Sequence, residues 1–408
     1  MYNIASLAIN MEELKKTIAN AKEWFMHSGI QNLDSGSLEV KGGFNVWFDR
    51  EKSSYFYTYS EITGYAITKL LALYTTEKNY LYLSRAVLAA EWLLDKAAHK
   101  SGGIKTRYFF NKEDTQDLYD FSSGVVHSFD NGMALNGLMD LFKLTKEKRY
   151  LIAAQKIGNL LTDIMQKEDG SMYASYSHKD EAFKDSDEKW SSQAGSFEVK
   201  VCSGLLKLYE ATKDEKYKEA TIKLCDYTLN LQKENGRFIS FKKEEDTHLH
   251  PHCYSAEGLL FAGLYLGKDT YVKAARNAVQ WALDQQLENG GIPSMFVSER
   301  KVEVERSDVL AQTIRLGIIM RSLKLLDEKY EEKIDKAVKR LITFQCTNGD
   351  QRSSGGFLYG HDIDYRNELR STEKNHVNTW CTMFAMQALN YYADYKEGKF
   401  VFDKEFIV

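Results

Sequence analysis

Two patterns of apolar residues alternate along the chain and predict two kinds of helix. In the first pattern, apolar residues recur at every third or fourth position and leave one charged face, as in a helix with one side in water. Six stretches have this pattern, at 11–29, 82–97, 150–166, 216–232, 270–286 and 329–345. In the second pattern, apolar and small residues cover most of the circumference, which predicts a buried helix. Six stretches have it, at about 60–80, 130–145, 198–212, 255–266, 307–326 and 377–395.

The connections between these helices are also of two kinds. Short polar turns lead from each buried helix to the next amphipathic one, and the clearest copies are 75–80, 145–150 and 212–217, with weaker copies at 266–271 and 326–330. The connections in the other direction are long, begin with Gly-Gly, Asn-Gly or Asp-Gly, and then alternate aromatic with polar residues. They occupy 42–60, 102–111, 169–180, 235–246, 289–306 and 355–371. This composition predicts β-hairpins or extended loops, all at one end of the helices.

Six helical hairpins with alternating buried and half-buried helices predict an (α/α)6 toroid. An open solenoid is the alternative, but it would expose an edge and would need atypical capping repeats. No capping repeat, linker or low-complexity stretch interrupts the pattern. We therefore expect one all-α domain over residues 1–408.

Composition narrows the classes of function. The net charge is −4 over 408 residues, which gives no reason to expect nucleic acid or an anionic membrane as a partner. No stretch approaches the ~18 apolar residues of a membrane span. The five cysteines form no C-x-x-C pair and the N-terminus resembles no secretion signal, so we expect a cytoplasmic monomer or homodimer. Nucleotide-binding motifs are absent, and we expect no cofactor.

Acidic residues recur near the start of the buried helices. They are Glu61, Asp130, Glu198, Glu257 and Asp308, while the sixth helix has His376 and Asn378. Helix capping is the simple explanation, because the helix dipole favours acids there. However, packed helices lie ~8–10 Å apart, so such acids can reach the ~5–9.5 Å separations that glycoside hydrolysis uses. Since a helix N-terminus favours the ionised form, we expect most of these acids to be bases or to hold sugar hydroxyls.

Histidines form a second group of candidates. His248, His250 and His252 alternate before the fourth buried helix, so in an extended segment they would share one side. His376 opens the sixth buried helix, and His127 precedes the second. We expect no metal, because no Cys or Asp follows at ligand spacing. Local hydrogen bonding and acid–base catalysis both remain open for them.

Aromatic and polar residues flank the same helix starts and are candidates for sugar binding, with core packing as the alternative for each. The candidates are Trp47, Tyr57, Tyr59, His127, Trp190, His250, Tyr254, Arg315, Asn378 and Trp380.

The Thr-x4-Tyr turns and Gly-Gly aromatic loops resemble those of the six-hairpin glycosidase-like (α/α)6 toroids, and the resemblance covers nearly the whole chain. It implies an enzyme related to glycoside hydrolases, unsaturated glucuronyl hydrolases, polysaccharide lyases or sugar 2-epimerases. The segment YSEITGY at 59–65 is also similar to the helical domain of glucuronyl C5-epimerases.

The placement of histidines resembles that in N-acylglucosamine 2-epimerases, which use one histidine before the fourth and one before the sixth buried helix. His250 or His252, with Glu257, and His376 match those places. Three features depart from that family. His252 and Glu257 are five residues apart rather than three, His-Val-Asn-Thr replaces His-Val-Pro-Arg, and the arginines of the first helix are missing.

We therefore expect a carbohydrate-active enzyme with a saccharide substrate, and specifically a glycoside hydrolase that uses two of the acids. Two alternatives remain open. One is a sugar epimerase or polysaccharide lyase that uses His252 and His376, and the other is a non-catalytic glycan-binding or assembly protein.

Overall fold

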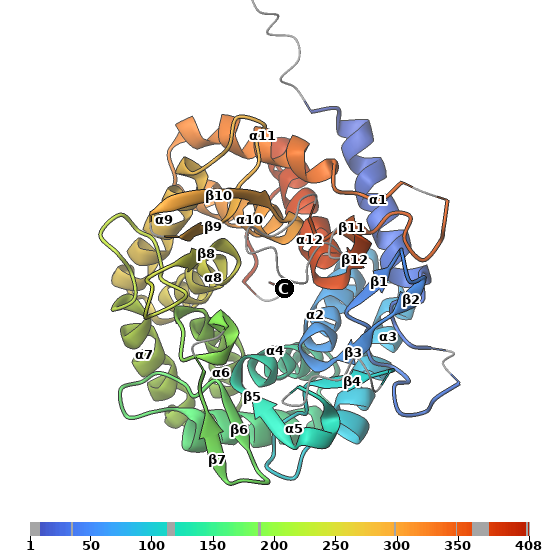
Figure 1. The fold of residues 1–408 in the computed structure, drawn as a ribbon, viewed down its shortest axis with the longest axis vertical. Helices are drawn as coiled ribbons and strands as arrows, with labels where there is room; N and C mark the ends of the chain where they lie inside the picture. The colour runs from blue at the N-terminus through green and yellow to red at the C-terminus, as the bar shows by residue number, and fades with distance from the viewer. Residues whose placement is uncertain are drawn as a thin grey trace, which may run out of the picture.

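Two concentric rings of helices make up the protein (Figure 1). The computed structural model describes residues 9–33, 36–111, 119–186, 189–297, 299–347, 349–360, 375–404 and 407. In this part of the chain, the outer ring consists of α1 (Met11–His27), α3 (Tyr80–Trp92), α5 (Lys148–Asn159), α7 (Glu215–Leu229), α9 (Asp269–Asp284) and α11 (Glu331–Ile342). The inner ring consists of α2 (Ser60–Glu77), α4 (Ser128–Thr145), α6 (Cys202–Thr212), α8 (Leu249–Leu266), α10 (Ser307–Ser322) and α12 (Thr379–Lys396).

Short helical segments of other types extend several of these helices. The π-helices η2 (Leu93–Ala97) and η5 (Leu160–Met165) continue α3 and α5. The 3-10 segment η7 (Ser196–Val201) precedes α6 and forms the first part of the third inner helix. Three further 3-10 segments are η4 (Phe121–Ser123), η6 (Trp190–Ser192) and η8 (Glu328–Tyr330).

The inner ring is closed. Each inner helix contacts the next, and α12 contacts both α2 and α1. Glycines allow some of these contacts to be close, because a Cβ atom at Gly64 of α2 would lie 2.6 Å from the carbonyl oxygen of Met133 in α4. The predicted (α/α)6 toroid is confirmed, and the open solenoid is wrong.

Small antiparallel sheets collect at one end of the ring and hold the starts of the inner helices. The strands form four sheets, with orders β11-β12-β1-β2, β10-β9-β8, β3-β4 and β5-β6-β7, and of the six segments predicted as hairpins or extended loops, 235–246 contains no strand. The strands are β1 (Trp47–Asp49), β2 (Ser54–Tyr55), β3 (Tyr57–Tyr59), β4 (Arg107–Phe109), β5 (Val125–His127), β6 (Ser175–Ser177), β7 (Ala182–Lys184), β8 (Thr247–His248), β9 (Pro293–Val297), β10 (Arg300–Glu305), β11 (Phe357–Leu358) and β12 (His376–Asn378). Strands β3, β5, β8 and β12 each end at the residue before an inner helix, so the sheets fix the first turns. The predicted loop 355–371 is described only as far as Gly360.

The short turns at the other end owe their shape to local hydrogen bonds. Three of these turns place a lysine in the left-handed region directly after the inner helix, with φ values of 56°, 61° and 61° for Lys78, Lys146 and Lys213. The threonine of each Thr-x4-Tyr marker donates its hydroxyl to the carbonyl oxygen four residues earlier, as in the 2.8 Å bond from Thr212 to Leu208. The Thr-x4-Tyr marker therefore encodes the end of one helix and the start of the next.

A glycine attaches each long loop to the next outer helix, and in five of the six loops a glutamine does so as well. Gly236 has φ +95°, and a Cβ atom there would press against the carbonyl oxygen of Asn277 in α9. Gln232 donates to the carbonyl oxygens of Gly236 and Ala274, at 2.9 Å each. Equivalent glycines are Gly42, Gly102, Gly170, Gly290 and Gly355. In the last copy, Gln345 donates to Thr17 of α1, so the same contact closes the ring.

The fourth inner helix begins earlier than predicted. It starts at Leu249 rather than near 255, so His250 and His252 are helical and only His248 is in a strand. Pro251 does not prevent this, because the first turn of a helix needs no N–H from it. The expected extended segment with three histidines on one side is therefore wrong.

The early start of α8 also changes the position of Glu257. This residue lies two turns inside α8, not in its first turn.

Candidate active site

Three acids from consecutive inner helices lie close together at the end that carries the sheets. Glu61 lies in the first turn of α2, Asp130 in the first turn of α4, and Glu198 in η7. Asp130 and Glu198 are 4% and 1% exposed, whereas Glu61 is half-buried. The charge of Asp130 raises the pKa of both Glu61 and Glu198. The structure thus brings together three of the five predicted acids, and we call them the acid cluster.

Burial controls the protonation of the acid cluster. Burial, followed by the charge of Asp130, raises the pKa of Glu61 to about 8. Burial raises the pKa of Asp130 to about 6, although the positive charge of Arg107 opposes the rise. It also raises the pKa of Glu198 well above its usual value. The expectation that the helix N-terminus keeps these carboxyls ionised is therefore wrong for Glu61 and Glu198, because the helix dipole is worth less than desolvation there, whereas Asp130 is still ionised at neutral pH.

A cation and three tyrosines surround Asp130. Tyr59 donates a hydrogen bond of 3.2 Å to Asp130 Oδ1. The Arg107 guanidinium lies over the rings of Tyr57, Tyr59 and Tyr119, with centroids at 4.9, 4.8 and 4.3 Å. The sequence had indicated the first two tyrosines, but not Arg107 or Tyr119. Arg107 lies in the predicted loop 102–111. The Gly-Gly pair at the start of this loop placed it at the end of the ring that carries the sheets, but nothing in the sequence indicated a role for Arg107 itself.

Asp308 lies in the first turn of α10 and is fully engaged in ion pairs. It accepts from Arg306 Nε at 3.0 Å and from Trp380 Nε1 at 3.0 Å, and it lies 3.0 Å from His250 Nδ1. Burial alone would raise the pKa of Asp308, but the charge of Arg306 and the hydrogen bonds from Arg306 and His250 hold it well below its usual range. Asp308 is therefore ionised at neutral pH and orients its partners rather than donating a proton.

His250 points from α8 toward Asp308 and aromatic rings. It is 6% exposed, and its ring centroid lies 4.4 Å from that of Tyr254 and 5.9 Å from that of Trp190. Burial lowers its pKa, while the nearby Asp308 carboxylate opposes that shift. At neutral pH the ring is consequently neutral and its orientation is fixed through Nδ1.

Trp47 and His376 form a stacked pair on strands β1 and β12. Their ring centroids are 4.3 Å apart at an interplanar angle of 7°, and Trp380 meets Trp47 edge-on at 6.4 Å. His376 Nε2 lies 3.7 Å from Asp49 Oδ2, but burial still lowers the pKa of His376 to about 4. Trp380 contacts Trp47 and also donates a hydrogen bond to Asp308, so the aromatic candidates and Asp308 form one continuous set of contacts.

His252 lies on the opposite side of α8 from His250. Because the two residues are separated by about 200° around a helix, they cannot share a face. His252 Nδ1 accepts from the backbone N–H of Phe238 at 3.1 Å, and its Nε2 lies 3.0 Å from the carbonyl oxygen of Ala278 in α9. It is 1% exposed, and burial lowers its pKa to about 4. Both ring nitrogens are thus used to join α8 to its neighbours.

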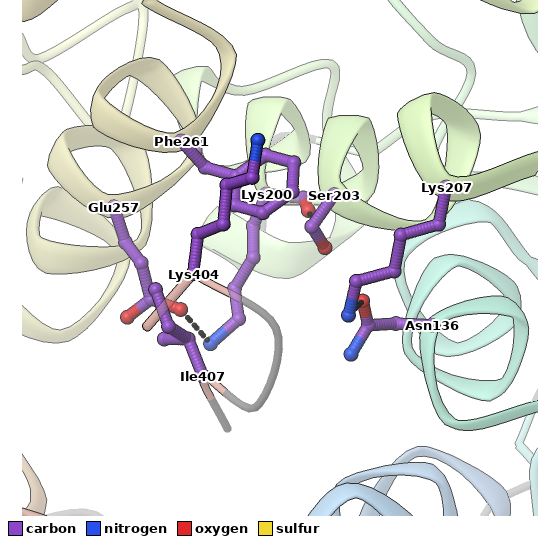
Figure 2. A pocket seen from close by; sticks show the side chains of 9 residues that line it. Asn136, Lys200, Ser203, Lys207, Glu257, Phe261, Lys404 and Ile407 are labelled. Atoms are coloured by element: carbon purple, nitrogen blue, oxygen red, sulfur yellow. Dashed lines mark hydrogen bonds and ion pairs between the residues drawn. The ribbon is translucent and has the colours of Figure 1, made fainter. Parts of the chain in front are cut away.

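Glu257 and Arg315 lie deeper on the ring axis than the acid cluster. Glu257 Oε1 lies 2.8 Å from Lys200 Nζ, and its other oxygen accepts from Arg315. Figure 2 shows Lys200 and Glu257 pointing toward each other beside a small cavity of about 10 Å³, which Lys404 and Ile407 of the C-terminal segment also line. Arg315 also donates to Gln387 Oε1 at 2.8 Å. These two residues hold the inner helices together below the acids.

The remaining candidates lie at or near the first turns of the inner helices. His127 stacks on Tyr119 at 4.8 Å, Trp190 packs edge-on against Phe197 at 5.0 Å, and Asn378 caps α12 by accepting from Cys381 N–H at 3.1 Å. Among the described residues, no group of three or more His, Cys, Asp or Glu side chains is placed to hold a metal ion. In the same part of the chain, no helix is long and apolar enough to cross a bilayer.

Comparison with known proteins gives one family match. Residues 66–265 match the model of Glycosyl hydrolase family 76. This segment runs from α2 to α8 and includes Asp130 and Glu198, but it begins five residues after Glu61. No curated protein sequence matches the chain.

Solved structures with the same architecture cover almost the whole chain. The cellobiose 2-epimerase of Bacillus thermoamylovorans matches with a TM-score of 0.73 and 12% identity, covering 93% of this chain and 98% of its own. A D-mannose isomerase matches with a TM-score of 0.71 and 13% identity, over 97% and 100% of the two chains. The unsaturated glucuronyl hydrolase of Bacillus sp. GL1 matches with a TM-score of 0.68 and 14% identity, over 94% and 97%. Fold and family match together make the chain a carbohydrate-active enzyme of the six-hairpin glycosidase-like (α/α)6 toroid superfamily.

Proposed function

We propose that this enzyme hydrolyses a glycosidic bond, with Glu61 as the general acid and Asp130 as the nucleophile or general base. The observation that carries the proposal is the placement of two carboxyls from the first turns of the adjacent helices α2 and α4 in different surroundings, since Tyr59 donates its hydrogen bond to Asp130. In agreement with this difference, the pKa is raised to about 8 for Glu61 and only to about 6 for Asp130. At neutral pH Glu61 holds its proton while Asp130 is ionised. Two neighbouring carboxyls in opposite protonation states are what glycoside hydrolysis requires.

The two carboxyls have complementary tasks in this proposal. Glu61, which is the more exposed of the two, donates its proton to the glycosidic oxygen as the bond to the anomeric carbon breaks. Asp130 faces the positive charge that develops on the sugar, and it either attacks the anomeric carbon or removes a proton from the attacking water. Tyr59 and Arg107 support its ionised form. The first step leaves Glu61 ionised. If Asp130 attacks the anomeric carbon, Glu61 takes a proton from the water that hydrolyses the glycosyl–Asp130 bond; if Asp130 activates the water, Asp130 takes that proton, and exchange with solvent restores both groups.

Aromatic side chains beside these acids support a sugar as the ligand. Tyr57 and Trp47 lie in an edge-on contact of 5.4 Å, and the stacked Trp47–His376 pair continues that surface toward Trp380. Flat rings bury the apolar faces of sugars while polar groups bind the hydroxyls, which is a common composition of binding pockets.

The test is turnover of a panel of oligosaccharides and polysaccharides with different linkages, followed through new reducing ends. Glu61→Gln and Asp130→Asn keep the size of each side chain and remove its acid–base chemistry, so each should lose about 10²–10⁴-fold in kcat. Glu215→Gln, at the exposed start of α7, is the matched control and should retain wild-type activity. Wild-type turnover by both active-site variants would contradict the proposal.

A second candidate function is sugar epimerisation with His250 and His376 as acid and base. The contact that favours it is the 3.0 Å approach of Asp308 to His250 Nδ1, which fixes the ring orientation as a catalytic carboxylate–histidine pair does. His250 takes the place of His252 here, because both nitrogens of His252 are engaged elsewhere. Incorporation of solvent deuterium at a sugar carbon, lost in His250→Ala, would support this candidate. Reducing-end release without deuterium incorporation would exclude it.

The cellular location and oligomeric state also stay as proposals. All five cysteines are free and buried, and the Sγ atoms of Cys202 and Cys225 are 3.9 Å apart without a bond. Unpaired thiols support a reducing compartment such as the cytoplasm. Size-exclusion chromatography with light scattering distinguishes the monomer from the homodimer.

A further inference from the structure

Lys200 occupies an aromatic enclosure on the ring axis, just beyond the acid cluster. Its ammonium lies over the rings of Tyr254, Tyr65 and Phe384, with centroids at 4.4, 4.8 and 5.4 Å. These rings come from three inner helices, α8, α2 and α12. The side chain of Lys200 is only 4% exposed, so its charge acts through a medium that screens it little.

One ion pair holds this ammonium on its lower side. Lys200 Nζ lies 2.8 Å from Glu257 Oε1, as Figure 2 shows. Arg315 binds the other oxygen of Glu257, so the carboxylate is itself fixed in place. The position of the Lys200 charge is thus determined by a carboxylate below and by aromatic rings around it.

The enclosure borders the general acid of the proposed mechanism. Tyr65, which contacts the ammonium, lies four residues after Glu61 on α2, and residues four apart share one face of a helix. Lys200 itself follows Glu198 by two residues in η7. A buried positive charge therefore lies against Tyr65, the residue one helical turn after Glu61, although Lys200 is too deeply enclosed to reach a substrate.

We propose that Lys200 is a positioning residue for catalysis: its ammonium, held by Glu257 and three aromatic rings next to the helix turn that follows Glu61, helps Glu61 to release its proton. The inference rests on the proposed role of Glu61 as the general acid. Lys200 acts only through Glu61 and touches no reacting atom.

The charges that face these two groups determine the sign of the effect. Burial and Asp130 raise the pKa of Glu61, whereas a hydrogen bond with Tyr59 and the charges of Arg107 and Lys200 lower it. Around Lys200, burial and Arg315 lower the pKa to about 8, while Glu257 and Glu61 oppose that shift. Removing the Lys200 ammonium takes away one of the positive charges that lower the pKa of Glu61. Glu61 then becomes a weaker acid and keeps its proton to higher pH.

The decisive experiment compares the pH dependence of kcat/KM in Lys200→Met and in the wild type. Glu61 and Lys200 both have a pKa of about 8, so the alkaline limb of the wild type reports the two groups together. In Lys200→Met the limb reports Glu61 alone, and it should lie about half a pH unit higher. Lys207→Met is the matched control, because Lys207 is also a buried lysine of the third inner helix but pairs with Asp140 and Asn136. It should lower the unfolding temperature without moving the limb. Lys200→Arg keeps the positive charge and should leave the limb close to its wild-type position.

A simple packing role for Lys200 would give a different result. Lys200→Met would then change stability or total activity while its alkaline limb stayed at the wild-type pH, and this outcome would overturn the inference. If Lys200→Met does not fold, Lys200→Gln repeats the test with a polar group beside Glu257.

Glu61→Gln distinguishes a failure of the general-acid role of Glu61 from a failure of the role of Lys200. Wild-type activity in Glu61→Gln removes the assigned general acid, whereas an inactive Glu61→Gln with an unmoved limb in Lys200→Met refutes only the role of Lys200.

Discussion

Tyr59 donates a hydrogen bond of 3.2 Å to Asp130 and thereby connects the strand before α2 to the first turn of α4. Tyr59 is the last residue of β3, directly before the helix that carries Glu61. One hydroxyl group thus ties together the two elements that supply the proposed acid and base. Its removal should change catalysis more than stability.

Replacing Tyr59 with Phe should move the acid limb of the pH profile upward by about one unit. The hydrogen bond favours the ionised form of Asp130, so its loss raises the pKa of that carboxyl. Tyr57→Phe is the control, since Tyr57 lies in the same strand and also contacts Arg107 through its ring. An unchanged acid limb in Tyr59→Phe would mean that Asp130 is not the base.

The wild-type enzyme should show a bell-shaped dependence of kcat/KM on pH. Activity requires Asp130 ionised, so it should rise as pH increases through about 6. It also requires Glu61 protonated, so it should fall as pH increases through about 8. Because the two carboxyls interact, the limbs report the pair as a whole. A profile that is flat from pH 5 to 9, measured on the best substrate of the panel, would be incompatible with this pair.

His252→Leu should destabilise the protein by about 2–3 kcal/mol and leave kcat within about twofold, because it leaves the N–H of Phe238 and the carbonyl of Ala278 unpaired. Burial lowers the pKa of folded His252 to about 4, so the stability it contributes is complete above pH ~6.5 and is lost as pH falls through 4. Urea unfolding of both proteins should therefore show a difference that shrinks toward low pH. A hundredfold loss of kcat with unchanged stability would contradict this structural role and would indicate that His252 takes part in catalysis.

Gly236→Ala tests the contact that attaches each long loop to the next outer helix. Alanine there combines an unfavourable φ of +95° with a clash against the carbonyl of Asn277, so we expect a loss of about 2–4 kcal/mol in unfolding free energy. Gly398→Ala is the control, because Gly398 has φ +68° but open space around it. It should lose only about 1 kcal/mol. Equal losses in the two variants would show that the approach to α9 is unimportant.

The architecture could be predicted from the sequence because its repeat is encoded locally. Threonine and lysine mark the three clearest short turns, and Gly-Gly, Asn-Gly or Asp-Gly begins each of the six long loops, so the repeat indicated a ring without any long-range information. The glutamines that join five of these loops to the next outer helix were present in the sequence, as in Gln232, but their partners lie one hairpin away. Such contacts between hairpins cannot be deduced from local pattern.

The site was harder to predict, because it depends on burial and on helix boundaries. Glu61, Asp130 and Glu198 were found from their place in the repeat. The protonation of Glu61 and Glu198 was predicted wrongly, because the sequence does not show how deeply a carboxyl is enclosed. Because α8 begins at Leu249 and continues past Pro251, His252 lies on the far face of α8 and Glu257 lies below the acid cluster. Arg107 and Lys200 have no motif, and only the fold places their charges beside Glu61.

The most direct test of the central claim is the dependence of Glu61→Gln on the leaving group. A glycan substrate needs a proton on its leaving oxygen, whereas a dinitrophenyl glycoside of the same sugar has a leaving group that departs without one. The account predicts that kcat for the glycan falls by about 10²–10⁴-fold in Glu61→Gln, while kcat for the dinitrophenyl glycoside falls by less than about tenfold. Equal losses on both substrates, or wild-type activity on the glycan, would contradict the role of Glu61 as the general acid.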